Sequence, residues 1–293
     1  RATRVMRAAL EAVTGLEFRA GPSSLSAGGG FATCQRWQGT TGPVFVKVAP
    51  RAREDALQAE GDALRELAAA RAVRVPAVLG AGSTHDRAFL ALEWIEFGSA
   101  RAGTEAQLGE QLARLHRTRA ARFGWHRDNT IGATPQRNGW SADWPQFFAT
   151  QRLGFQFDLA ERSGHGGRWV EQGRVLCERL PAFFGSYAPQ PSLLHGDLWG
   201  GNWAADDSGA PVIFDPATYF GDREADLAMT HLFGGFGREF HAAYEAAWPL
   251  DSGASARRNL YNLYHVLNHL NLFGGGYRRQ AERMIERLLA EIR

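Results

Sequence analysis

Cysteine is scarce in this sequence, and it lacks both long apolar runs and a surplus of one charge. The two cysteines, Cys34 and Cys177, lie far apart, which argues against a disulfide framework and against a zinc knuckle. No apolar run reaches the roughly 18 residues of a membrane span, and the Arg-rich start lacks the apolar stretch of a signal peptide. Thirty-three basic and 31 acidic residues leave a net charge of +2, too little for a polyanion-binding stripe. We therefore expect a cytoplasmic protein with neither nucleic acid nor membrane as a partner.

The composition is that of an ordinary folded chain. Of the 293 residues, 44% are hydrophobic and 22% are charged, which excludes disorder and fibrous repeats. This length predicts one large domain or two modest ones. We find no internal repeat.

Lysine occurs only once. The 33 basic residues are 32 arginines and Lys47. The position that kept lysine is a candidate for chemistry that needs a compact ammonium and not a planar guanidinium. Chance is the alternative, since a single lysine must fall somewhere.

The first 95 residues predict a small α+β lobe. Extended segments are expected at 34–38, 43–48, 73–79 and 88–95, and a helix at 53–70, where leucines recur at helical spacing. Lys47 lies on the second of these strands. A glycine cluster, Ser26 to Thr33, precedes it and either brings the backbone close to a ligand or turns a hairpin.

From residue 98 to 293 the pattern is mostly helical. Thr104 and Gln107 have the spacing of a helix-capping box, and residues 277–292 form an amphipathic helix. Between these helices, two short apolar strands flank a turn at 206–209. The overall prediction is an α+β fold: an antiparallel sheet with one main helix, then a larger helical lobe.

One loop and its surroundings carry the chemistry. The run S-L-L-H-G-D-L-W-G-G-N ends at Asn202, and I-F-D-P with Asp215 follows the hairpin. This order, with a strand lysine and a helix bearing Glu60 upstream, is the phosphotransfer layout of protein kinases and their relatives. An aspartate can take the acceptor hydroxyl proton, and amide and carboxylate oxygens suit Mg²⁺. The sequence therefore predicts a phosphoryl-transfer site.

The run H-G-D-L-W-G-G-N at His195 resembles the signature of the fructosamine and ketosamine kinase family. Similar stretches include G-P-V-F-V-K-V at Gly42, A-E-G-D-A-L-R-E-L at Ala59 and D-P-A-T-Y-F-G-D-R-E-A-D-L-A at Asp215, and the resemblance covers nearly the whole chain. It implies a bilobal protein-kinase-like fold and ATP-dependent phosphorylation of the sugar 3-hydroxyl of ketosamines. The acceptors would be ketosamines on small amines or on protein lysines, and the unstable product would lead to deglycation.

The resemblance also implies residue roles, with ATP and Mg²⁺ as cofactors. Asp197 would be the catalytic base, in a catalytic loop at 195–202. Asn202 and Asp215 would bind Mg²⁺, the latter in a metal-binding segment at 215–217. Lys47 would hold the ATP phosphates, with Glu60 as its partner.

The nucleotide contacts are expected at two further places. A hinge at about 92–97 would bind adenine through its backbone, which leaves the side chains of Glu93 and Trp94 free to vary; Ile95 completes this set. Gly28, Gly29 and Gly30 would belong to the phosphate-covering loop. This loop departs from the kinase pattern because no G-x-G-x-x-G is present and Phe31 stands where a small or polar residue is expected.

Several residues keep two interpretations. Trp199 either fills the core of the lobe or stacks on a sugar through its apolar face. Asp222 either braces the fold, which we favour, or attracts the ammonium of a ketosamine. Trp140 either borders the acceptor pocket or packs within an insert.

Two histidines and one glycine have simpler interpretations. His195 is expected to shape the catalytic loop, not to transfer a proton. His265 and His269 have the spacing of a zinc protease, but Val266 stands where its glutamate would be, so packing in a core or groove is favoured. Gly196 replaces the usual arginine of protein kinases, so control by an activation loop is not expected.

The alternatives to a ketosamine kinase are a related aminoglycoside or choline kinase, a catalytically silent ATP-binding module, and a non-enzymatic interaction domain. We expect a monomer.

Overall fold

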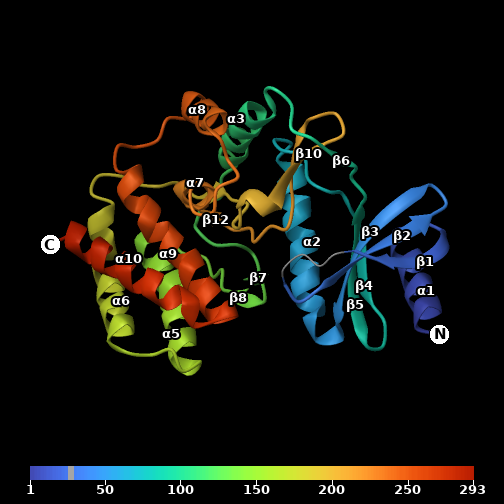
Figure 1. Cartoon of the computed structure of the whole chain (residues 1–293), viewed down its shortest axis with the longest axis horizontal. Helices are drawn as coiled ribbons and strands as arrows, with labels where there is room; N and C mark the ends of the chain where they lie inside the picture. Colours follow the sequence, from blue (N-terminus) through green and yellow to red (C-terminus); the bar gives the residue numbers. More distant parts are fainter. Residues whose placement is uncertain (26–29) are drawn as a thin grey trace.

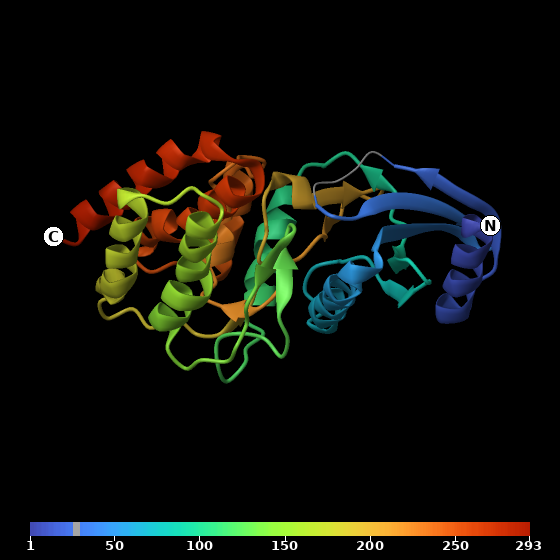
Figure 2. The same cartoon turned by 90° about the horizontal axis from the view of Figure 1, so that it is seen from below.

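The computed structural model describes residues 1–25 and 30–293 (Figure 1). Gly28 and Gly29 of the predicted glycine loop therefore lie outside the described residues. A sheet with a helix on each face lies at the N-terminal end and a cluster of helices at the C-terminal end, so the two termini lie at opposite ends of the molecule (Figure 2). This confirms the predicted α+β fold with two lobes.

The small lobe is built on an antiparallel sheet. In the described residues its strand order is β1-β2-β3-β5-β4. The bounds are β1 (Phe18–Ser24), β2 (Thr33–Gly39), β3 (Gly42–Pro50), β4 (Val78–Ser83) and β5 (Arg87–Glu93). Val44, Val46 and Val48 of β3 pack with Met6 and Leu10 of helix α1 (Ala2–Thr14). Because side chains alternate along a strand, Lys47 then points to the opposite face.

Helix α2 (Glu54–Ala69) covers that opposite face. Its buried side chains include Leu57, Leu64 and Leu67, which belong to one apolar core with residues of β5 and of the helical lobe. Arg127 of the large lobe also reaches α2, with its guanidinium nitrogens 2.7 Å from Asp62 and 2.6 Å from Asp55. A shared core and these ion pairs therefore hold α2, and Glu60 on it, between the lobes.

The large lobe is mainly helical. Its helices are α3 (Thr104–His116), α4 (Trp144–Phe147), α5 (Phe155–Arg162), α6 (Arg168–Arg179), α7 (Glu224–Thr230), α8 (Arg238–Ala247), α9 (Ala254–Phe273) and α10 (Arg278–Glu291). Its short strands are β7 (Asn129–Ile131), β8 (Thr134–Gln136), β9 (Ser192–Leu193), β10 (Trp203–Asp206), β11 (Pro211–Ile213) and β12 (Phe220–Gly221). β6 (Phe97–Gly98) pairs with β10 just after the small lobe ends. No helix in the described ranges is long and apolar enough to cross a membrane.

Most predicted elements are confirmed, two local predictions are wrong, and one helix was not predicted. The extended segment expected at 73–79 begins only at Val78. The capping box does not form: Thr104 is the first helical residue, and its hydroxyl donates to the Gly209 carbonyl 2.7 Å away, 105 residues along the chain. Helix α1 was not predicted at all, although it is amphipathic, because its few buried positions offer little signal.

Candidate active site

Lys47 brings together the two lobes at the site. Its Nζ lies 2.8 Å from Glu60 Oε2 on α2 and 2.6 Å from Asp215 Oδ1 in the large lobe. Burial by itself would lower the pKa of Lys47, but the two carboxylates outweigh burial and raise it well above its ordinary value. The lysine is therefore a permanent cation. The single lysine of the chain stands where two acidic side chains need a compact partner.

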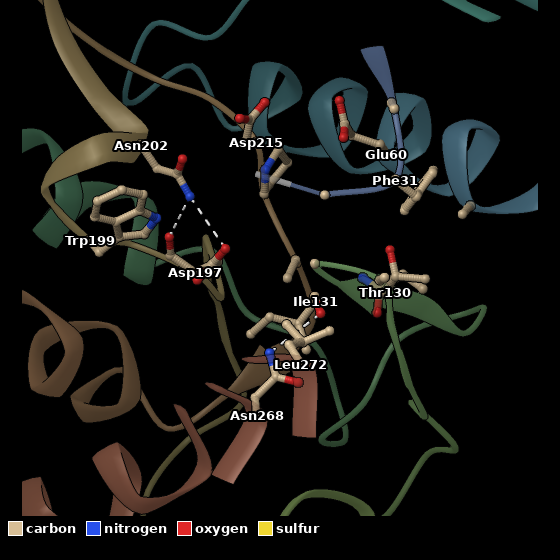
Figure 3. A pocket seen from close by; sticks show the side chains of 18 of the residues that line it. Phe31, Glu60, Thr130, Ile131, Asp197, Trp199, Asn202, Asp215, Asn268 and Leu272 are labelled. Carbon is tan, nitrogen blue, oxygen red and sulfur yellow. Dashed lines mark hydrogen bonds between the residues drawn. The ribbon is translucent and has the colours of Figure 1, made fainter. Parts of the chain in front are cut away.

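Asp197 and Asn202 meet in the loop that joins β9 to β10. The Asn202 amide nitrogen donates to the Asp197 main-chain oxygen at 2.8 Å and to its carboxylate at 3.3 Å (Figure 3). Burial raises the pKa of Asp197 to about 8; the charge of Asp215 adds to this, and the hydrogen bond from Asn202 opposes it. Asn202 therefore orients Asp197 through two hydrogen bonds, one to the main-chain oxygen of Asp197 and one to its carboxylate.

His195 and Asp226 fix the shape of this loop. The ring of His195 accepts a hydrogen bond from the Asp197 main-chain N–H through Nδ1 (3.1 Å) and donates through Nε2 to the Phe214 carbonyl (2.6 Å). Both ring nitrogens are thus used in the neutral form, and burial lowers the pKa of His195 accordingly. The Asp226 carboxylate accepts the main-chain N–H groups of His195 and Gly196, each at 2.9 Å. His195 has the shaping role that the sequence predicts, and it has no free nitrogen for proton transfer.

Gly196 is required by its surroundings. Its φ is +92°, and a Cβ built on it would lie 1.9 Å from the Ala217 carbonyl oxygen. That carbonyl follows Asp215, so the catalytic loop and the metal-binding segment press together here. No side chain fits at this position, which explains why the arginine of protein kinases is missing.

The predicted residues border one cavity of about 720 Å³ between the lobes. Lys47, Glu60, Asp197, Asn202 and Asp215 all line it, as does Gly30 of the glycine loop. Figure 3 shows the catalytic-loop residues on one side of this space and the residues of α2 on the other. The residues that the sequence analysis assigns as base, metal ligands and phosphate-binding cation therefore lie at one cavity.

Trp199 stands at the cavity and not in the core. It lines the cavity with 41% of its surface exposed, so the interpretation as a core residue is wrong. A Cβ on Gly201 would lie 2.2 Å from the Trp199 ring, so the indole covers that glycine closely. Its ring also meets Phe233 edge to face, with centroids 6.4 Å apart.

Two other proposed substrate residues do not reach the cavity lining. Asp222 is fully buried and accepts hydrogen bonds from the hydroxyls of Tyr187 and Tyr261. Burial, with the charge of Glu224 adding to it, raises its pKa to about 7. Trp140 lies against Phe220, with ring centroids 6.3 Å apart. Asp222 therefore has the bracing role that we favoured, and Trp140 is not a wall of this cavity.

The predicted hinge also lies outside the cavity lining. The Glu93 carboxylate accepts from Arg74 (3.0 Å) and from the Ala77 main-chain N–H (3.1 Å), so this side chain has contacts of its own. Trp94 donates to Glu96 through its indole N–H at 2.8 Å. Ile95 is buried. These side chains stiffen the connection between the lobes, and the adenine contact stays a prediction.

Some residues of the site had no signal in the sequence. One wall of the cavity comes from β7, with Thr130 and Ile131, and another from α9, with Asn268 and Leu272. His265 and His269 line this wall, in agreement with packing in a groove. Within the described residues, no cluster of three or more histidine, cysteine or acidic side chains could hold a metal ion. The zinc-protease interpretation therefore has no support.

The donor set fits Mg²⁺ bound together with phosphates. Asn202 uses its amide nitrogen toward Asp197, which leaves its carbonyl oxygen facing no described donor, and Asp215 offers a carboxylate. Asp215 also has φ +51°, a conformation that non-glycine residues avoid and that is found where a side chain is held for function. Mg²⁺ commonly takes one or two protein oxygens and completes its shell with water and substrate phosphates.

The fold and this site define a phosphotransferase of the protein-kinase-like class. The family model of fructosamine kinase matches residues 3–291. The chain is 46% identical over 246 residues to a "Probable ketoamine kinase" of Synechocystis, covering 84% of this chain and 82% of that protein. It is 40% identical over 265 residues to the chloroplastic protein-ribulosamine 3-kinase of Arabidopsis thaliana, covering 89% and 81%.

A solved structure agrees with these relatives. The crystal structure of a "Putative fructosamine-3-kinase" from Haemophilus somnus is similar with a TM-score of 0.89 at 27% identity, covering 98% of this chain and 97% of that one. The chain belongs to the fructosamine kinase family. Membership of a kinase family implies ATP as the phosphoryl donor.

Proposed function

We propose that the protein transfers the γ-phosphoryl group of Mg·ATP to the sugar 3-hydroxyl of a ketosamine, and so starts deglycation. The observation that carries this proposal is the convergence of Lys47, Asp197, Asn202 and Asp215 on one cavity between the lobes. The resemblance of the catalytic loop to ketosamine kinases, and the names of the relatives, supply the acceptor class. The acceptor is a free ketosamine or a glycated lysine of a protein.

Each of these residues has its own role in the proposed reaction. Asp197 takes the proton of the acceptor hydroxyl as that oxygen attacks phosphorus. Lys47, held by Glu60, binds the phosphates that remain with the leaving nucleotide. Catalysis by such a site is mainly positioning and neutralisation of charge, because the attacking hydroxyl and the phosphoryl group must be aligned.

Asn202 and Asp215 would hold Mg²⁺ through their oxygens. The ion, when bound, offsets the charge that builds up on the transferring phosphates. Lys47 pairs directly with Asp215 at 2.6 Å, so the cation and one of the proposed metal ligands lie side by side.

Trp199 would form the acceptor side of the cavity. It belongs to the 195–202 loop, it is partly exposed, and its indole lies beside Asp197 at the same cavity (Figure 3). An aromatic face can stack on a sugar ring or attract an ammonium group. We therefore place the sugar of the ketosamine between Trp199 and Asp197.

The variant Asp197→Asn tests this proposal. We expect ATP binding to stay near normal and kcat to fall by roughly 10² to 10⁴, the range for loss of a positioned base. The matched control is Asp207→Asn, because Asp207 is exposed on the β10–β11 turn and does not line the cavity. Unchanged turnover by the Asp197 variant would remove this residue from the mechanism.

The acceptor class needs a separate measurement. A phosphoryl-transfer assay with fructosamine, ribulosamine, an aminoglycoside and choline compares the candidate acceptors directly. Faster turnover of the aminoglycoside or choline than of both ketosamines would favour a related small-molecule kinase. Binding of ATP without turnover of any acceptor would favour a silent module, and absence of ATP binding a non-enzymatic domain.

A further inference from the structure

A second cavity, of about 660 Å³, lies in the large lobe where the end of α7 meets α9 and α10. Arg258 and Asn262 reach it from α9, Arg283 and Arg287 from α10, and His231 from the turn after α7. Arg283 and Arg287 are four residues apart, so they lie on one face of α10. Three guanidinium groups therefore border one hollow.

These arginines have no acidic partner. Within residues 1–25 and 30–293, none of the three makes a hydrogen bond or an ion pair, and no aspartate or glutamate lines the cavity. The neighbouring Arg257 shows the contrast: it is buried, with guanidinium nitrogens 2.8 Å from Glu224 and 2.9 Å from Asp251. Of these two neighbouring arginines on α9, the one at the cavity, Arg258, is thus the one without a compensating charge.

His231 reports the same positive field. Burial, with the charges of the nearby His241 and Arg258 adding to it, lowers the pKa of His231 to about 4. The two imidazoles stack with ring centroids 4.1 Å apart. Arg258 also lowers the pKa of His241. Burial is the largest cause for both histidines, and Glu105 opposes the shift of His241; Arg258 adds a positive charge beside both rings, which favours an anion here.

Asn262 adds a second, independent feature. It is 4% exposed, and its Nδ2 donates to the Ala228 carbonyl at 2.8 Å. Its Oδ1 is buried and has no hydrogen-bond partner among the described residues. A buried acceptor without a donor costs about 1 to 3 kcal/mol. Asn262 lines the cavity, so a turn of its side chain toward the cavity would let a hydroxyl group of a ligand donate to this oxygen and relieve the cost.

The second cavity is distinct from the active site. The segment 229–233 separates them, because Met229 and Phe233 line the active-site cavity whereas His231 and Leu232 line the second one. On α9, Asn262 borders the second cavity and His265 the first. None of the arginines of the second cavity lines the active-site cavity.

We propose that this cavity binds a small phosphorylated polyol, with its phosphate held by Arg258, Arg283 and Arg287 and one of its hydroxyl groups donating to Asn262. Guanidinium groups bind phosphate oxygens in a forked, charge-assisted geometry, and three of them can surround one phosphate. The ligand is therefore of the sugar phosphate class.

Isothermal titration calorimetry on the full chain tests the site, with a non-hydrolysable ATP analogue present to fill the nucleotide site. The probes are ribose 5-phosphate, ribose and inorganic phosphate. We expect ribose 5-phosphate to bind more tightly than inorganic phosphate, and ribose not to bind. The double variant Arg283→Gln/Arg287→Gln should weaken ribose 5-phosphate binding by about 10²-fold, at about tenfold for each charged hydrogen-bonding partner.

Arg279→Gln is the matched control, because Arg279 is exposed on the same helix and does not line the cavity. It should bind ribose 5-phosphate like the wild type. Both arginines of the double variant are exposed, so its melting temperature should stay close to that of the wild type. Equal binding by the double variant and the wild type, or no binding of any probe by the wild type at millimolar concentration, would overturn the proposal. Equal affinity for inorganic phosphate and ribose 5-phosphate would overturn the proposal that the hydroxyl groups of the ligand contribute to binding.

Discussion

Replacing Lys47 by arginine is the sharpest test of the proposed active site. The substitution keeps the positive charge and changes only the shape of the head group. In the structure a single nitrogen lies 2.8 Å from Glu60 and 2.6 Å from Asp215. A planar guanidinium is broader than an ammonium, so it cannot place one nitrogen at this point between the two carboxylates without moving one of them.

The magnitude follows from that displacement. A shift of about 1 Å in a catalytic constellation costs about 10²-fold in rate, which corresponds to about 2.7 kcal/mol of transition-state stabilisation. Stability should change less, since both carboxylates keep a cationic partner and the Asp215 side chain is 43% exposed. We therefore expect kcat/KM to fall by about 10²-fold, while the melting temperature decreases by only a few degrees.

The assay is release of ADP in the presence of a ketosamine acceptor, with thermal unfolding measured on the same preparations. Arg174→Lys is the matched control, because it exchanges the same two residue types in the opposite direction. This arginine forms an ion pair with Asp158 at 2.9 Å and does not line the cavity. It should leave kcat/KM unchanged. If Lys47→Arg keeps kcat/KM within threefold of the wild type, the geometric argument is refuted and the single lysine is a coincidence.

Three further outcomes follow from the structure. Gly196→Ala should lower the free energy of unfolding by about 2 to 4 kcal/mol and abolish turnover, because the added Cβ would lie 1.9 Å from the Ala217 carbonyl oxygen. A variant with a normal denaturant midpoint and normal activity would contradict this. Gly201→Ala should displace the Trp199 ring, 2.2 Å from the added Cβ, and raise KM for the acceptor more than KM for ATP; equal effects would argue against a role of Trp199 in acceptor binding. Burial, with a contribution from His269, lowers the pKa of His265 to about 3. Below about pH 6.5 the unfolded chain therefore binds a proton at this histidine that the folded chain does not bind. The free energy of unfolding should thus fall by about 2 kcal/mol from this histidine as the pH is lowered from 7.5 to 5. Urea unfolding at both pH values should show a smaller loss for His265→Gln than for the wild type, and equal losses would refute the shift.

The strands and the main helices followed from the sequence because their signals are local. The run from Pro43 to Val48 is rich in β-branched residues, and the helix at 54–69 repeats leucine at helical spacing. The order of Lys47, Glu60, Asp197, Asn202 and Asp215 followed as well, because the chemistry of phosphoryl transfer constrains residue types and their spacing.

Other features depended on contacts between distant segments. The hydroxyl of Thr104 bonds the carbonyl of Gly209, a partner that no local capping rule can predict. Asp222 was open to two interpretations until the hydroxyls of Tyr187 and Tyr261 were seen to enclose it. Trp199 likewise could have been a core residue, and only its exposed position at the cavity decides otherwise.

The sequence by itself determined which side chains are capable of the reaction, since residue type and spacing are properties of the chain. Only the tertiary structure decided that they meet, because residues 47 and 215 are brought within 2.6 Å by the packing of two lobes. The arginine cavity illustrates the same physical reason. Arg258 and Arg283 belong to ordinary amphipathic helices in sequence, and the side-by-side packing of α9 and α10 concentrates their charge at one place.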